Sequence, residues 1–307
     1  MRKSLRFALL MAILAGIFWV NSGVAHAEKL QSYSESAWKY LKTLTGFGPR
    51  NFGSFGYQRT IDLIKKVGAE YADAVDVQTF AFSGASGKTL KMSNIRLRFK
   101  GTRKGPAILV GAHFDTRPFA DEETNPALKS RPILGANDGG SGTAVALAMA
   151  RFLKNNRDRR DVDLVFFDGE DYGAKGSGEN LLGSTHYANQ LRQTKRDEWP
   201  YCVIIIDMVA DRNLEIFKET HSIKSASWLV DLIYGTAEKM SVTQFRSESK
   251  YTIFDDHYPF IGLGVPSVVL IDFDYPNWHK LTDTLDKCSP ESMFAVFRVM
   301  AEVLGKI

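Results

Sequence analysis

Acidic residues and histidines recur in this sequence behind short apolar stretches. Those stretches are typical of β-strands that are buried on both faces. Directly after each stretch, or after a following loop, come residues that can bind a metal or move a proton: His113, Asp138, Glu170, Asp171, Asp207 and His279. Zn²⁺ takes histidine nitrogen and carboxylate oxygen, and a catalytic zinc keeps one position open for water or substrate. The set therefore predicts zinc-dependent catalysis.

The spacing around Asp138 supports a cation rather than a phosphate as the ligand. His113 and Asp115 are two residues apart, so in an extended segment their side chains point the same way. Asp138 is followed by two glycines and a predicted helix, which also resembles a phosphate-binding loop. That alternative is disfavoured because the segment has no lysine and Asp138 would repel a phosphate.

Glu170 and Asp171 form an adjacent pair of acids. Neighbouring residues at a strand end diverge, which suits one as a metal ligand and the other as a general base. Alone, such a pair is more typical of a solvated turn. Its combination with the other acids and histidines favours a metal site. His186 and His221 lack acids at ligand spacing, and we expect them to be surface or core residues.

Apolar spacing predicts the elements that must position these residues. Helices are expected at 35–45, 56–72, 142–153, after 181, at 226–239 and at 290–303, the last with Ser289 as N-cap. Strands are expected at 75–82, 92–99, 107–110, 162–167, 202–206 and 267–271. The first two strands form a hairpin, and strands and helices alternate after it. The pattern predicts a single α/β domain, with a mixed, mostly parallel central sheet flanked by helices on both faces.

In such sheets ligands bind outside the carboxyl ends of the strands, and four predicted strands bring acids or histidines to that edge.

The basic run Arg157–Arg160 is interpreted as a solvated turn. Cys202 and Cys288 have no C-x-x-C spacing, and the sequence leaves open whether they pair or remain separate thiols.

Residues 1–27 have the pattern of a secretory signal peptide. Three basic residues, Arg2, Lys3 and Arg6, precede an apolar run over 7–20 and a small-x-small site at 25–27. The run is shorter than the roughly 20 residues that a membrane-spanning helix needs. We therefore expect cleavage after Ala27, a single catalytic domain at 28–307, export to the periplasm or the medium, and no stable membrane anchor.

The composition excludes several other classes of protein. The 307 residues are 44% hydrophobic and 24% charged, with 25 Gly and 10 Pro, which is ordinary globular usage. Removing the three basic residues of the leader lowers the net charge from +4 to +1. Binding of nucleic acid through bulk charge is therefore not expected.

Six motifs carry a resemblance to a known family. In chain order they lie at 111–118 (GAHFDTRP), 132–139 (PILGANDG), 168–173 (DGEDYG), 206–209 (IDMV), 255–257 (DDH) and 278–279 (WH). Together they resemble the zinc-dependent glutaminyl-peptide cyclotransferases of animal and bacterial type, from about residue 35 to the C-terminus. Those enzymes share their fold with the co-catalytic zinc aminopeptidases.

The resemblance implies a role for each matched position. One zinc would be held by Asp138, Asp171 and His279, with Glu170 as general base and acid; Asp207 would orient the substrate amine, Asp256 would join the hydrogen-bond network behind it, and Trp278 would line the pocket. The implied substrate is a peptide or protein with an N-terminal glutamine. Position 171 is Asp where many relatives have Glu, so the backbone must come closer to the metal.

A hydrolytic alternative stays open. In the aminopeptidases, residues that match His113 and Asp207 bind a second zinc, Asp138 bridges the two ions, and the position of Glu170 activates water. The flanking motifs at 117–118, 255–257 and 278 favour the cyclotransferase. A non-catalytic relative would be expected to have lost ligands, and none is missing.

Overall fold

The computed structural model describes residues 30–85 and 87–307, so the predicted signal peptide lies outside the described residues. The described chain starts in a helix that continues to residue 46, followed by α2 (Phe55–Tyr71). Ser54 is the N-cap of α2, and its side chain accepts the backbone N–H of Tyr57. Both opening helices were predicted from apolar spacing.

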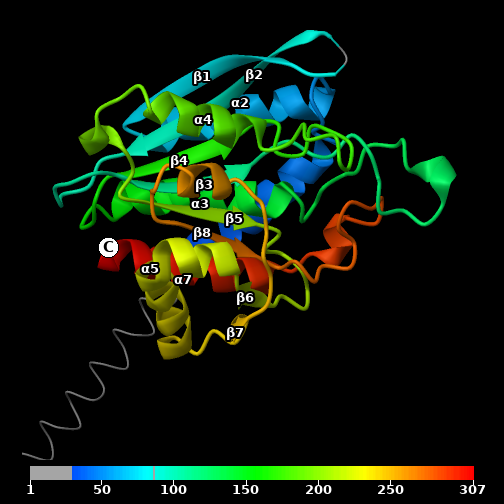
Figure 1. Ribbon diagram of the computed structural model, residues 1–307. Helices are drawn as coiled ribbons and strands as arrows, with labels where there is room; N and C mark the ends of the chain where they lie inside the picture. Colours follow the sequence, from blue (N-terminus) through cyan, green and yellow to red (C-terminus); the bar gives the residue numbers. More distant parts are fainter. Residues whose placement is uncertain (1–29, 86) are drawn as a thin grey trace, which may run out of the picture.

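A six-stranded sheet forms the centre of the molecule, with the order β1-β2-β4-β3-β5-β8 (Figure 1). Strands β1 and β2 form an antiparallel hairpin, and β2 is also antiparallel to β4. The other pairs are parallel. The strands are β1 (Ala74–Ser83), β2 (Thr89–Phe99), β3 (Ile108–His113), β4 (Val162–Phe167), β5 (Cys202–Asp207) and β8 (Ser267–Ile271). This confirms the predicted mixed, mostly parallel sheet.

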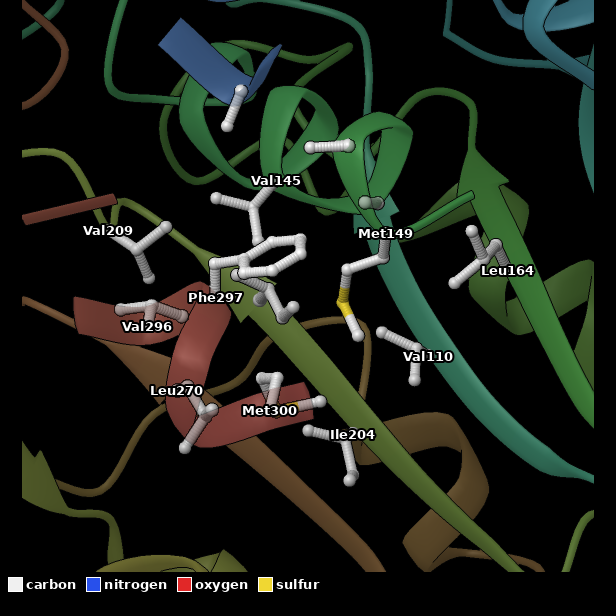
Figure 2. Packing of buried hydrophobic residues seen from close by; sticks show 14 of the residues in the cluster. Val110, Val145, Met149, Leu164, Ile204, Val209, Leu270, Val296, Phe297 and Met300 are labelled. Atoms are coloured by element: carbon white, nitrogen blue, oxygen red, sulfur yellow. The ribbon is translucent and has the colours of Figure 1, made fainter. Parts of the chain in front are cut away.

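Helices cover both faces of the sheet because the inner strands are apolar on both sides. Val110 and Leu164 pack into one core cluster with α2, α3, α5 and α7, whereas Leu109 and Val165 pack into a second with α4 and α6. Figure 2 shows side chains of α3 and α7 packed against β3, β4, β5 and β8. The helices are α3 (Gly140–Asn155), α4 (Leu182–Leu191), α5 (Thr220–Lys239), α6 (Tyr258–Ile261) and α7 (Pro290–Lys306), with 3₁₀ turns at Pro126–Leu128, Arg196–Glu198 and Leu285–Lys287.

Three features differ from the sequence-based expectations or add to them. A small parallel sheet of β6 (Ile216–Lys218) and β7 (Phe245–Ser249) was not predicted, because both strands are short and β7 has no buried residue. The interpretation of Arg157–Arg160 as a solvated turn is wrong for Arg159. This residue is 2% exposed, and its guanidinium donates to the carbonyls of Phe99 and Leu153. Cys202 and Cys288 are buried free thiols.

In the part of the chain that the structure describes, no helix has the length and apolar character needed to cross a membrane.

Candidate metal and catalytic site

The carboxyl ends of β3, β4, β5 and β8 meet at a cavity of about 440 Å³. Six of the predicted site residues line it: Asp138, Glu170, Asp171, Asp207, Trp278 and His279. His113 ends β3 and is only 1% exposed. The sheet topology thus brings together residues that are up to 166 positions apart in the sequence, from His113 to His279.

Asp138, Asp171 and His279 form a group that fits a metal ion. His279 Nε2 lies 3.4 Å from Asp138 Oδ2 and 3.3 Å from Asp171 Oδ1. Zinc bonds of 2.0–2.1 Å in a tetrahedron place ligand atoms about 3.3 Å apart, so these separations match. Among the described residues, Asp138 Oδ2 and Asp171 Oδ2 are buried without a hydrogen-bond partner. Such oxygens are costly unless a cation or a proton satisfies them.

A second group of ligand type shares Asp138 with the first. His113 Nε2 lies 3.3 Å from Asp138 Oδ1 and 3.2 Å from Asp207 Oδ1. Each oxygen of Asp138 therefore faces a different histidine, as in a bridging carboxylate. The charge of Asp207 raises the pKa of His113 well above its usual value, against the opposing effect of burial.

Glu170 lines the cavity beside the first group but belongs to neither ligand set. Burial, followed by the charge of Asp171, raises its pKa well above the usual value for a glutamate. The two adjacent acids differ in this respect. Burial also opposes ionisation of Asp171, yet His279 and then Arg117 hold its pKa well below the usual range. The surroundings thus favour the charged form of Asp171 and the protonated form of Glu170.

Arg117 fixes the carboxylate of Asp171, and sequence reasoning did not give it this role. Its Nη1 donates to Asp171 Oδ1 at 2.7 Å, and its Nη2 pairs with Asp121 at 3.0 Å. The guanidinium is buried and also lines the cavity. The ion pair helps to place the shorter arm of Asp171, which the sequence analysis identified as a departure from many relatives.

Two further carboxylates hold the loops that carry the acidic ligands. Asp115 accepts the backbone N–H groups of Glu170 (3.2 Å) and Asp171 (3.1 Å). Asp283 accepts those of Asn137 (2.8 Å) and Asp138 (3.0 Å). Each of these two segments is therefore anchored through two consecutive amides by one buried acid, an arrangement that would keep the candidate ligands in place for a metal.

Three residues at the site have a positive backbone φ angle, which is rare in proteins except at glycine. Gly139 has a φ of 75°, and a Cβ there would lie 2.4 Å from the carbonyl oxygen of Asp115. Met208 and His279, both on the cavity wall, adopt φ values of 44° and 54°. Residues other than glycine are strained when φ is positive, and such backbone strain often accumulates at functional sites.

The sequence of this chain matches a known family of peptidases and several curated relatives. Residues 94–304 match the pattern of peptidase family M28. The chain belongs to this family. Among curated relatives, it is 28% identical over 63% of its length to an aminopeptidase of Bacillus subtilis and 26% identical over 62% to the glutaminyl-peptide cyclotransferase of Boiga irregularis. These matches span only 39% and 60% of the relatives' own lengths.

A solved structure matches this M28 chain more completely. The glutaminyl cyclase of Tannerella forsythia superimposes with a TM-score of 0.82 at 30% identity, covering 89% of this chain and 98% of that one. The resemblance to glutaminyl cyclases that the motifs predicted is therefore confirmed, as is the relation to aminopeptidases.

The acid pair at 255–256 is divided between the cavity wall and the interior behind it. The resemblance implies that Asp256 joins the hydrogen-bond network behind the substrate amine, and this role stays a prediction. The structure puts Asp255 on the cavity wall, whereas Asp256 is fully buried outside the lining and its backbone N–H donates to Asp255 Oδ1 at 2.5 Å. Consecutive residues in this turn before α6 point in different directions, so only one of the two can face the cavity.

The other aromatic and histidine residues lie as follows. Trp278 lines the cavity, and its ring stacks on that of His279 at 4.0 Å. His186 stacks on Phe80 at 4.6 Å, away from the ligands. His221 packs against Phe254 near the cavity rim. Neither of the last two histidines belongs to a ligand group found among the described residues.

Removal of the Asp283 carboxylate should destabilise this M28 fold. The variant Asp283→Ala leaves two backbone N–H groups and the hydroxyl of Tyr275 (2.8 Å) without their acceptor. Each lost partner costs about 1–3 kcal/mol. Burial raises the pKa of Asp283 to about 7, so relief of its desolvation offsets part of the loss. We expect unfolding to become easier by about 3 kcal/mol in denaturant titration.

Asp286→Ala is the matched control, because this nearby aspartate is exposed and pairs with Lys287 at the surface. Its unfolding midpoint should match that of the wild type. An unchanged unfolding midpoint for Asp283→Ala would show that these hydrogen bonds make no net contribution to the free energy of unfolding.

Proposed function

We propose that this chain is a zinc-dependent glutaminyl-peptide cyclotransferase. It would convert the N-terminal glutamine of a peptide or protein to pyroglutamate, with release of ammonia. One observation carries the proposal: all three members of the group Asp138, Asp171 and His279 line the cavity beside Glu170, whereas His113 of the second group does not. A metal held by the first group would therefore face the cavity with all of its protein ligands, and a catalytic metal keeps one position open for the substrate. Relatives named glutaminyl-peptide cyclotransferase and glutaminyl cyclase support this proposal.

In this proposal one zinc is held by Asp138, Asp171 and His279, and it supplies Lewis-acid polarisation of the side-chain carbonyl of the substrate glutamine. Glu170 accepts a proton from the α-amine as that amine forms a bond to the carbonyl carbon. The same carboxyl then donates the proton to the departing amide nitrogen, which leaves as ammonia. Its raised pKa suits this double task.

Two further acids would hold the amine. Asp207 and Asp255 both line the cavity, and their carboxyl oxygens can accept hydrogen bonds from the amine N–H groups. The lining also includes the apolar side chains of Met208, Ile271 and Trp278. These side chains would pack on the folded-back glutamine and exclude water, which is the main demand of an intramolecular reaction.

The second candidate function is a zinc aminopeptidase with two metal ions. The observation that favours it is the group of His113, Asp138 and Asp207, which shares Asp138 with the first group as a bridging carboxylate would. In that case Glu170 would activate water instead of the substrate amine.

Zinc titration of the full mature chain distinguishes the two candidates. The cyclotransferase proposal expects ammonia release from a glutamine peptide to reach its maximum at one zinc per chain, and a leucine peptide of equal length to stay intact. Full activity only at two zinc ions per chain, with release of free leucine, would establish the aminopeptidase instead.

We further infer that residues 1–27 direct export and that 28–307 form the mature catalytic domain. The basic start and apolar run support this inference. Mass analysis of protein recovered from an expressing Gram-negative host should give a chain that begins at Glu28 and lies in the periplasm or the medium. A full-length chain retained in the cytoplasm would contradict it.

A further inference from the structure

An exposed aromatic cluster lies at the rim of the cavity. Phe254 is a lining residue, yet 59% of its surface is exposed. Its ring meets that of Tyr258, itself 37% exposed, edge to face at 4.5 Å, and both rings pack on His221 at 5.2 and 5.0 Å. An exposed phenylalanine contributes little to folding, but it offers apolar area to whatever enters the cavity.

The support under this cluster is rigid. Glu219 is 2% exposed and caps α5, and its carboxylate accepts the backbone N–H groups of His221 (2.8 Å) and Ile253 (3.1 Å). One buried acid thus ties the start of α5 to the segment that precedes Phe254. Tyr258 opens α6 on the other side. The segment before Phe254 is therefore tied to α5, and α6 follows it. A substrate that binds Phe254 would lose little free energy in ordering this part of the chain.

The position of Phe254 in the chain sets what part of a substrate it would meet. It directly precedes Asp255, which lines the same cavity. Neighbouring Cα atoms are about 3.8 Å apart in the protein and in a bound peptide alike. If the amine of the first substrate residue lies at Asp207 and Asp255, the next substrate residue is about one such step away, and Phe254 lies within that reach because it is the chain neighbour of Asp255.

We propose that Phe254 and Tyr258 form a specificity subsite for an aromatic or large apolar side chain at the residue after the N-terminal glutamine. This inference rests on the proposed cyclotransferase function and names the class of peptides that the site prefers. A phenylalanine or leucine at that position would cover the exposed ring of Phe254, and an aromatic side chain would add an edge-to-face contact.

The test compares two peptides that differ only at their second residue, Gln-Phe and Gln-Gly, with the zinc-loaded mature chain. We expect kcat/KM to favour the Gln-Phe peptide by about tenfold in the wild type. In Phe254→Ala the ratio should fall close to one, and Phe254→Trp should retain the preference. Phe55→Ala serves as control, since Phe55 is 72% exposed on α2 and is not a lining residue of this cavity.

The outcomes separate the inference from the function on which it rests. Cyclisation of both peptides at equal rates by the wild type, or an unchanged ratio in Phe254→Ala, would overturn the subsite and leave the cyclotransferase standing. Failure of the wild type to cyclise either peptide would overturn both.

Discussion

Glu170→Gln should lower the turnover of a glutamine peptide by at least about a hundredfold while leaving bound zinc unchanged. General acid-base catalysis contributes typically 10²–10⁴-fold, and the amide can neither accept the amine proton nor return one to ammonia. Glu170 lies outside both ligand groups, so the metal should stay. Steady-state kinetics and elemental analysis on the same preparation measure both quantities.

The matched control is Glu198→Gln, which makes the same change at an exposed glutamate in a surface 3₁₀ turn. It should retain full turnover. Near-normal turnover in Glu170→Gln would refute the assignment of Glu170 as the proton carrier. Loss of turnover together with loss of zinc would make Glu170 a ligand instead.

His279→Ala should abolish stoichiometric zinc binding. The change removes the only nitrogen ligand of the group Asp138, Asp171 and His279 and leaves two neighbouring carboxylates. Loss of a partner that merely orients a ligand costs 10–100-fold in metal affinity, so loss of the ligand itself should cost more than about a hundredfold. Elemental analysis after dialysis, with a competing chelator to rank affinities, checks this.

His186→Ala provides the control, because His186 stacks on Phe80 and belongs to no ligand group of the described residues. Its zinc content should equal that of the wild type. His113→Ala separates the two candidate functions, since it should leave one zinc in a cyclotransferase and remove the second zinc of an aminopeptidase. One zinc per chain in His279→Ala would contradict the assignment of the ligands.

The sequence predicted the central strands well because burial on both faces leaves a continuous apolar run. Strands β4 and β8 begin and end where the pattern placed them, at Val162–Phe167 and Ser267–Ile271. The pair β6 and β7 escaped detection because one strand has three residues and the other is largely exposed. Without burial there is no periodicity for a strand to show.

The site was predictable where ligands follow strands, and less so where partners are distant. Sequence order cannot show that Asp283 binds amides 145 and 146 residues away, or that Arg50 donates to the carbonyl of Gly135. Nor does it decide which of Asp255 and Asp256 faces the cavity, because the direction depends on the turn before α6. A buried arginine such as Arg159 looks like a surface residue until its carbonyl partners are known.

In the proposed reaction, the amine of an N-terminal glutamine displaces the nitrogen of its own side-chain amide in this cavity. The most direct test uses a peptide that carries an isotopic label in that amide nitrogen, incubated with the zinc-loaded mature chain and followed by mass spectrometry. We predict that the label leaves as ammonia while the peptide keeps its full number of residues. Labelled free glutamine with a peptide shortened by one residue would contradict the claim and establish hydrolysis.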